Sequence, residues 1–134
     1  MKISTKGRYA LRLMVDLAEH PDANCVSLKD ISERQGISLK YLESIVAGLV
    51  KNGLLDSIHG KGGGYKLNRA AGDYKVGEIL RIAEGDLAPV SCEACSGEQC
   101  AHIGECKTKN MWDKLGELIN DYLDGISLAD LLAM

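Results

Sequence analysis

The sequence contains no phenylalanine, one tryptophan and two prolines among its 134 residues. Aliphatic side chains must therefore build most of the core, and a composition of 46% apolar and 26% charged residues predicts one globular domain with, at most, a helical appendage. No apolar run approaches the roughly 20 residues that a transmembrane helix needs. The stretch Met1–Tyr9 is polar and charged and lacks the apolar core of a secretory signal. We therefore expect a cytoplasmic protein with no membrane partner.

The net charge of −3 conceals an asymmetry along the chain. Residues 1–69 carry 11 Lys and Arg against 7 Asp and Glu, whereas residues 70–134 carry 5 against 12. A basic half followed by an acidic half is typical of a phosphate-binding module joined to a sensing or pairing module. The basic excess is modest, however, and charge scattered over a solvated surface would also explain it.

The spacing of apolar residues predicts three helices in the first half of the chain. The first runs from about Thr5 to Glu19. The second begins at Ser27 and is broken at Gly36, which can adopt the left-handed conformation that ends helices. Ser38 caps the third, which stops at Asn52-Gly53. Two helices joined by a short turn that contains glycine predict a helix-turn-helix.

A glycine-rich segment, Gly60–Gly64, separates the strand candidates Leu54–His59 and Tyr65–Asn68. A hairpin directly after a helix-turn-helix predicts a winged helix, so the fold class is mainly α with a small β-hairpin wing. The segment is not a nucleotide-binding loop, because it lacks the spacing of GxxxxGK[ST] or GxGxxG and does not open a helix.

The second half predicts a short helix, Val76–Glu84, and a long amphipathic helix, Thr108–Leu123, with a short capped helix from Ser127 to the end. We therefore divide the chain into a winged helix-turn-helix domain (1–84), a cysteine-bearing loop (85–107) and a C-terminal part (108–134). The long helix has no partner of equal length within the chain, so we expect it to pack on a second copy. The predicted dimerisation residues are Met111, Leu115, Leu118, Ile119 and Tyr122.

The second helix of a helix-turn-helix enters the major groove of DNA, and its N-terminal residues meet base edges. Lys40 can reach a guanine or a phosphate, Glu43 can accept from cytosine N4, and Ser44 can donate or accept. The Tyr41 hydroxyl suits a phosphate oxygen, although Tyr41 also has the size of a packing residue. The wing, with free backbone N–H groups along Gly62–Gly64, and the start of the first helix can contact phosphates. The predicted DNA-binding residues are Ser38, Lys40, Tyr41, Glu43, Ser44, His59, Lys61, Gly62, Gly63, Lys6 and Arg8.

Four of the five cysteines lie within 15 residues, with the spacing Cys92-x2-Cys95-x4-Cys100-x5-Cys106. In a chain without a secretion signal such a group favours metal or redox chemistry over structural disulfides. The CxxC pair suits zinc or an iron–sulfur cluster, and the later gaps fit the two knuckles of a zinc site poorly. A reversible disulfide switch is the other alternative. Cys25, alone between the first two helices, is interpreted as an ordinary thiol.

The sequence resembles the IscR/NsrR/CymR group of bacterial winged-helix regulators over nearly its whole length. The residues that carry this resemblance are MKISTKGRYA at the start, SLKYLE from Ser38, KNGLL from Lys51, GKGGGY from Gly60 and EILRIAEG from Glu78. The resemblance implies a homodimer paired through the long C-terminal helix and a palindromic operator in double-stranded DNA. It also implies gene control by iron–sulfur status, nitric oxide or sulfur supply.

Cluster-bearing members of that group place three cysteines with five-residue gaps before the dimer helix, and Cys100, Cys106 and the following tryptophan match this pattern. An equal gap before Cys100 falls on alanine, between Cys92 and Cys95. The histidine that is the fourth ligand in some members corresponds to Lys109, and the acidic ligand of others corresponds to Arg8. The resemblance and the extra cysteine together imply a 2Fe–2S or 4Fe–4S cluster held by Cys92, Cys95, Cys100 and Cys106.

The sequence thus predicts a homodimeric DNA-binding regulator, a repressor in the family's usual sense, whose operator affinity is set by an iron–sulfur cluster. Genes of iron–sulfur biogenesis or sulfur metabolism are the expected targets. One alternative keeps DNA binding and gives the cysteines a thiol-redox or zinc role. Another is an iron–sulfur electron carrier or cluster-transfer protein. No Ser/His/Asp or Cys/His constellation indicates an enzyme.

Overall fold

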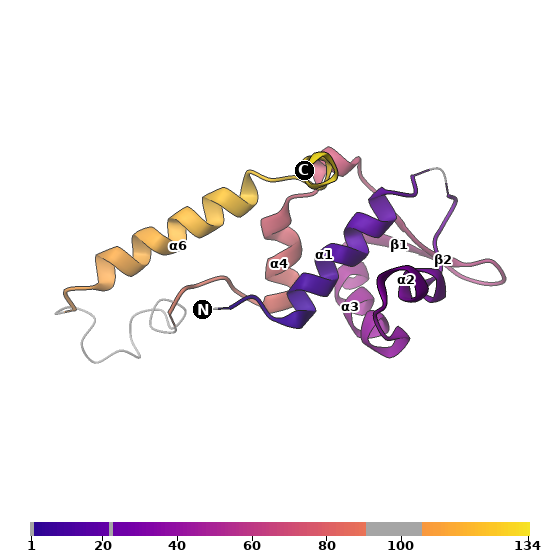
Figure 1. The fold of residues 1–134 in the computed structure, drawn as a ribbon, viewed down its shortest axis with the longest axis horizontal. Helices are drawn as coiled ribbons and strands as arrows, with labels where there is room; N and C mark the ends of the chain where they lie inside the picture. The colour runs from indigo at the N-terminus through magenta and orange to yellow at the C-terminus, as the bar shows by residue number, and fades with distance from the viewer. Residues whose placement is uncertain (1, 22, 91–105) are drawn as a thin grey trace.

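The computed structural model describes residues 2–21, 23–90 and 106–134. The wing is a two-stranded antiparallel sheet of β1 (Leu55–Ile58) and β2 (Gly64–Leu67). It directly follows the helix-turn-helix of α2 (Leu28–Gln35) and α3 (Leu39–Lys51). A mainly helical chain with one hairpin confirms the predicted fold class (Figure 1). The elements in chain order are α1 (Thr5–Ala18), α2 (Leu28–Gln35), α3 (Leu39–Lys51), β1 (Leu55–Ile58), β2 (Gly64–Leu67), the 3-10 turn η1 (Ala71–Asp73), α4 (Val76–Glu84), α6 (Lys109–Asp124) and α7 (Leu128–Ala133).

Serine residues cap four helices: Ser4 caps α1, and Ser27, Ser38 and Ser127 cap α2, α3 and α7. The hydroxyls of Ser27, Ser38 and Ser127 accept the N–H three residues further on, at 3.2, 3.2 and 3.1 Å. Gly36 ends α2 in the left-handed conformation with φ of 67°. These local signals are the ones that the sequence analysis used, and α4 also has the predicted bounds.

Both strands differ from their predicted ranges. The N–H of Leu54 donates to the Leu49 carbonyl at the end of α3, so β1 begins one residue later than predicted and ends at Ile58. The N–H of Asn68 donates to the Tyr74 hydroxyl at 2.8 Å, so β2 ends at Leu67. Tyr74 is fully buried, and its own hydroxyl donates to the Leu54 carbonyl at 2.7 Å. Burial raises the pKa of Tyr74, which keeps its phenol protonated as a donor.

The wing is extended by Val26, which lies between the first two helices just before α2. Val26 pairs with Tyr65 of β2 through two N–H···O bonds of 2.8 Å. Gly64 makes this approach possible, because a Cβ at that position would lie 2.3 Å from the Val26 carbonyl oxygen. The wing is therefore attached to the segment that enters α2 as well as to the segment that leaves α3.

The helix α6 extends away from the winged-helix body (Figure 1). Its C-terminal half returns to α4, where Arg81 donates to Asn120 at 2.8 Å and to Asp124 at 2.7 Å. A second hydrophobic cluster, separate from the main core under α1 and α3, fills this junction; its buried members are Val76, Leu80 and Leu87. Within the described ranges, no helix combines the length and the apolar character that crossing a bilayer requires.

A buried carboxylate joins α1 to the end of α2. Asp16 is 1% exposed, and Arg34 donates to its two oxygens at 2.7 and 3.0 Å while Gln35 donates at 3.0 Å. Burial by itself raises the pKa of Asp16, but the hydrogen bonds from Arg34 and Gln35 and the positive charge of Arg34 outweigh it, and the pKa lies below its ordinary value. Asp16 is therefore ionised at neutral pH and fixes the angle between the two helices.

Replacing Asp16 with alanine should lower the free energy of unfolding by about 2–3 kcal/mol at neutral pH, because charged hydrogen bonds are lost and their donors are left without an acceptor. The difference from the wild type should shrink as the pH falls through the lowered pKa of Asp16, because protonation then removes the same charge from the wild type. Urea unfolding at several pH values and one protein concentration measures the loss of stability and its dependence on pH.

Lys114→Ala is the matched control, because Lys114 and its partner Glu117 are two-thirds exposed and 3.6 Å apart. This exposed pair should change stability by less than about 0.5 kcal/mol. Equal losses in the two variants would contradict the special role of the buried carboxylate.

Candidate nucleic-acid interface and thiol segment

The turn between α2 and α3 is held by contacts that fix the first turn of α3 in space. Ile37 is buried, and the Ser32 hydroxyl donates to its carbonyl at 2.6 Å. Ser38 then caps α3 through the N–H of Tyr41. Together with the left-handed conformation of Gly36, these contacts fix the backbone of the turn between the two helices. The start of α3 is therefore exposed to solvent and held in place by these contacts.

Five of the predicted DNA-binding residues share the exposed face of α3. The opposite face is the buried stripe of Leu42, Ile45, Val46 and Leu49. A helix whose first turns combine exposed cationic, anionic, hydroxyl and aromatic side chains has the chemistry required for reading base edges and phosphates. The exposed residues are Ser38, Lys40, Tyr41, Glu43 and Ser44.

Two residues of α1 complete this surface, and the sequence analysis missed them as functional candidates. The Tyr9 ring meets the Tyr41 ring edge-on, with centroids 5.5 Å apart and an interplanar angle of 78°. The Arg12 guanidinium lies over Tyr9 at 5.6 Å, and its Nε donates to the side chain of Gln35 at 3.1 Å. The spacing of Tyr9, Arg12 and Asp16 along α1 (i, i+3, i+7) was a readable signal for a polar face turned toward α2 and α3.

The wing tip carries His59 and Lys61, both exposed. Gly60 and Gly62 have φ of 96° and 77°, which a residue with a Cβ rarely adopts. The N–H of Gly63 donates to the Gly60 carbonyl at 3.0 Å. The expectation that the N–H groups of Gly62–Gly64 are all free for phosphate is therefore wrong for Gly63, because the tight turn uses that donor internally.

Lys6 and Arg8 are exposed at the N-terminus of α1. The backbone there is bound by a carboxylate from the end of α4. Glu84, the last residue of α4, accepts from the N–H of Ser4 at 3.0 Å and from the N–H of Gly7 at 3.1 Å. A Cβ at position 7 would lie 2.3 Å from the Glu84 carboxylate. A carboxylate at a helix N-terminus is favourable, so this contact fixes the first turn of α1 against the end of α4.

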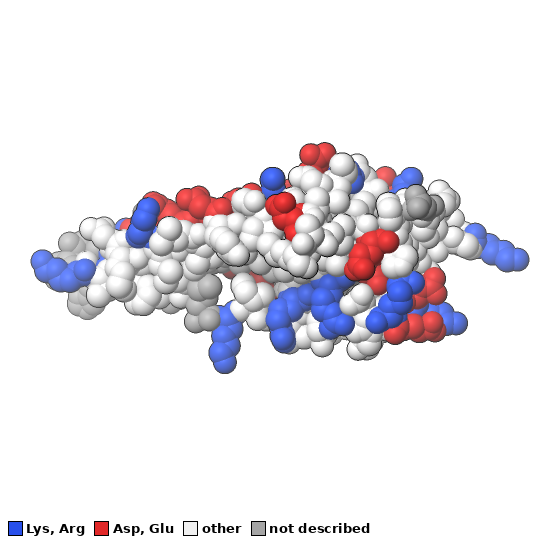
Figure 2. All heavy atoms as spheres, turned by 45° about the horizontal axis from the view of Figure 1, so that its top comes forward, with Lys and Arg blue, Asp and Glu red and all other residues white. Residues whose placement is uncertain are grey.

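Charge is distributed over the molecule as the sequence suggested. Figure 2 shows acidic side chains along the upper edge of α6 and a row of basic side chains along the lower edge of the winged-helix body, with some acidic side chains beside them. Basic side chains gathered along one edge favour the approach of a polyanion to that edge, even in a molecule of net charge −3.

Among the four clustered cysteines, only Cys106 belongs to the described residues; Cys92, Cys95 and Cys100 lie outside them. The Cys106 thiol is exposed and accompanied by the Thr108 hydroxyl at 3.2 Å. The Thr108 side-chain and backbone groups lower the pKa of Cys106 below that of an ordinary thiol. Thiolates are the form that binds soft metals, so this donor fits an iron–sulfur cluster.

No group of three or more His, Cys, Asp or Glu side chains that could hold a metal is found within residues 2–21, 23–90 and 106–134. That range contains one of the four predicted ligands. The described residues therefore leave the four-cysteine ligand set as a prediction.

The apolar stripe predicted on α6 is exposed for the most part. Leu118 and Tyr122 are 54% and 67% exposed, and Met111 and Leu115 are exposed as well. Ile119 differs from the other four, because it packs against the second hydrophobic cluster of its own chain. Four large side chains on one helix thus have no cover within the described part of the chain.

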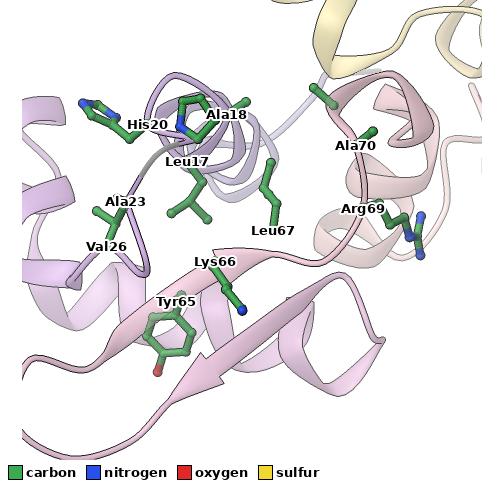
Figure 3. Close-up of a pocket in the computed structure, with 12 residues that line it drawn as sticks. Leu17, Ala18, His20, Ala23, Val26, Tyr65, Lys66, Leu67, Arg69 and Ala70 are labelled. Carbon is green, nitrogen blue, oxygen red and sulfur yellow. The ribbon is translucent and has the colours of Figure 1, made fainter.

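A pocket of about 240 Å³ lies between the end of α1, β2 and η1 (Figure 3). Leu17, Val26 and Leu67 line it together with Lys66, Arg69 and His20, and the last two of these have partners. Arg69 pairs with Glu78 at 2.7 Å, and His20 Nδ1 lies 2.7 Å from the Asp16 carbonyl oxygen. None of the predicted site residues lines this pocket.

Known proteins similar to this chain are transcriptional regulators. The sequence profile of the Rrf2 family, iron-dependent transcriptional regulators, matches residues 3–134. A putative HTH-type transcriptional regulator, ORF2, of Azotobacter vinelandii is 46% identical over 99% of this chain and 80% of its own length. The HTH-type transcriptional regulator IscR of Erwinia tasmaniensis is 42% identical over 98% of this chain and 79% of its own.

Solved structures agree with these relatives. The structure of T. potens IscR superposes with a TM-score of 0.79 at 43% identity, covering 99% of this chain and 87% of that one. The structure of CymR, the global cysteine regulator of B. subtilis, superposes with a TM-score of 0.82 at 33% identity, covering 99% and 97%.

Proposed function

Because the chain belongs to the Rrf2 family of transcriptional regulators, we propose that it binds a palindromic operator as a homodimer and that an iron–sulfur cluster sets its operator affinity. The family membership confirms the predicted resemblance and the DNA-binding, regulatory character of the chain. The observation that carries the proposed interface is the exposed polar face at the start of α3, held by Asp16, Arg12 and the Ser38 cap.

On this interface Lys40, Glu43 and Ser44 enter the major groove, while Lys61 and His59 of the wing and Lys6 and Arg8 of α1 contact phosphates. The phosphate contacts supply most of the affinity, and the side chains on α3 supply the sequence preference. The edge-to-face contact of Tyr9 with Tyr41 couples the position of α1 to that of α3. The first turns of both helices therefore meet the DNA as one unit.

The dimer forms through the exposed stripe of α6. Two copies of an amphipathic helix can cover each other by a twofold axis, because the same patch is then complementary to itself. The stripe of Met111, Leu115, Leu118 and Tyr122 is long and apolar enough to need such a cover. Because each α6 is tied to its α4 by Arg81, pairing of α6 would set the distance between the two α3 helices.

Cys106, together with Cys92, Cys95 and Cys100, would hold the cluster. The bound cluster would supply a centre whose presence depends on iron and sulfide. Two residues separate Cys106 from the start of α6. Leu87, on the other side of the cysteines, packs in the second hydrophobic cluster with Ile3 and Ile119. Binding of the iron–sulfur cluster would therefore affect the positions of both the dimer helix and the N-terminus of α1.

A free-energy difference of about 1–3 kcal/mol between the two states would change operator affinity by about 5- to 150-fold. Genes of iron–sulfur biogenesis or sulfur metabolism are the targets that fit such a signal.

Lys61→Ala should reduce the slope of log affinity against log salt concentration by about one per protomer, because each phosphate contact releases about one counterion. Fluorescence anisotropy on a labelled duplex across a salt series measures the slope. Lys114→Ala removes an equal charge from α6 and should leave the slope unchanged. A salt-independent affinity in the wild type would contradict DNA binding itself and favour an electron-carrier or cluster-transfer role.

Protein purified without oxygen should contain both iron and acid-labile sulfide, and Cys106→Ser should lose most of both. Cys25→Ser is the control, because the Cys25 thiol donates to the Gly62 carbonyl at 3.1 Å in the wing and should not affect the cluster. Elemental analysis and visible absorption spectra provide the readout. Zinc without sulfide, or a reversible disulfide without metal, would replace the proposed cluster by a zinc site or a thiol switch.

Leu118→Glu should weaken dimerisation on the order of 100-fold or more, because a twofold axis places the buried charge in the interface twice. Sedimentation equilibrium over a concentration series measures the effect. Leu132→Glu, on α7, changes a side chain that is also exposed, at 42%, and lies off the stripe. A wild type that stays monomeric at micromolar concentration would rule out the homodimer.

A further inference from the structure

We propose that Leu39 determines specificity by contacting the C5-methyl group of a thymine about two base pairs from the base that Glu43 reads. This proposal rests on the proposed binding of α3 in the major groove. It assigns a role to an apolar side chain that the polar contacts of the interface do not explain.

Leu39 is the first residue of α3, and its side chain is 43% exposed. It belongs to neither hydrophobic cluster of the described residues, even among the side chains that pack against those clusters from outside. Tyr41, the other large exposed hydrophobic side chain on α3, already has an aromatic partner in Tyr9. Leu39 therefore presents an aliphatic surface at the end of the helix that enters the groove first.

The position of Leu39 on the helix places it beside the polar reading residues. Leu39, Glu43 and Ala47 follow each other at intervals of four residues, and all three are exposed. Four helical residues span about 6 Å, which corresponds to about two base-pair steps. An acidic side chain that accepts from cytosine is thus flanked on the same face by an aliphatic one.

Only one base presents an apolar group in the major groove, and that group is the methyl of thymine. Leucine can form no hydrogen bond with any base edge, so a polar base opposite it would lose water without gaining a partner. Contact with a methyl group removes two apolar surfaces from water together. The chemistry of Leu39 therefore selects thymine over the other three bases.

The test removes the methyl group from the DNA and leaves base pairing intact. A duplex is first selected with the wild-type protein from a randomised library, and each of its thymines is then replaced by deoxyuridine, one at a time. At fixed ionic strength, one replacement in each half of the duplex should weaken wild-type binding by about 3- to 5-fold, which corresponds to one buried methyl group. The same replacement should have no effect on Leu39→Ala.

Leu132→Ala serves as the matched control, because it shortens an equally exposed leucine on α7 and should respond to uracil as the wild type does. If no replacement weakens wild-type binding, or if Leu39→Ala keeps the full penalty, Leu39 does not read a methyl group. Both outcomes leave the proposed function standing. Failure of the wild type to enrich any duplex overturns the proposed function and this inference together.

Discussion

The carboxylate of Asp16 is the contact on which the geometry of the reading surface depends. It is buried in α1, and it holds the last two residues of α2 through Arg34 and Gln35. Arg12, one turn earlier on α1, binds the same Gln35 and stacks on Tyr9, which in turn meets Tyr41 on α3. A charge removed from water must find strong partners, and here its partners are at the turn of the helix-turn-helix. The angle at which α3 leaves the body follows from that requirement.

The rest of the molecule divides into a compact winged-helix body, which carries the proposed DNA interface, and the helix α6, which follows the cysteine-bearing segment. The compact body contains the basic half of the chain together with η1, α4 and α7 of the acidic half, and α6 stands apart from it (Figure 1). The two parts meet at one small apolar cluster and at the contacts of Arg81 with Asn120 and Asp124. Because few contacts cross this junction, a modest change in the 85–107 segment can alter the relative placement of the two parts. A more extensive core at the junction would resist such a change.

The fold was predictable wherever a local signal decides structure. Caps such as Ser38 and the left-handed Gly36 act within a few residues, so the sequence located the helix ends to within about one residue. Other contacts join residues far apart in the sequence, such as Val26 with Tyr65 and Glu84 with Ser4. No local sequence pattern predicts these contacts. Tyr9 and Arg12 were missed although their spacing with Asp16 along α1 is a local signal, because that spacing does not show which residues of α2 and α3 they contact. The exposed residues of α3 were identified. The residue roles on α3 and the four-cysteine ligand set stay predictions, and three of those cysteines lie outside the described residues.

The hydrogen bonds of Glu84 to Ser4 and Gly7 have a practical consequence for anyone handling this chain. The residues before α1 are part of the folded body, with Ile3 packed in the second cluster and Ser4 bound to the end of α4. An affinity tag fused directly ahead of them would lie beside both the turn of α1 that we propose to contact DNA and the segment that leads to the cysteines. Met134, at the other end, is 80% exposed and makes the safer attachment point for purification or surface immobilisation.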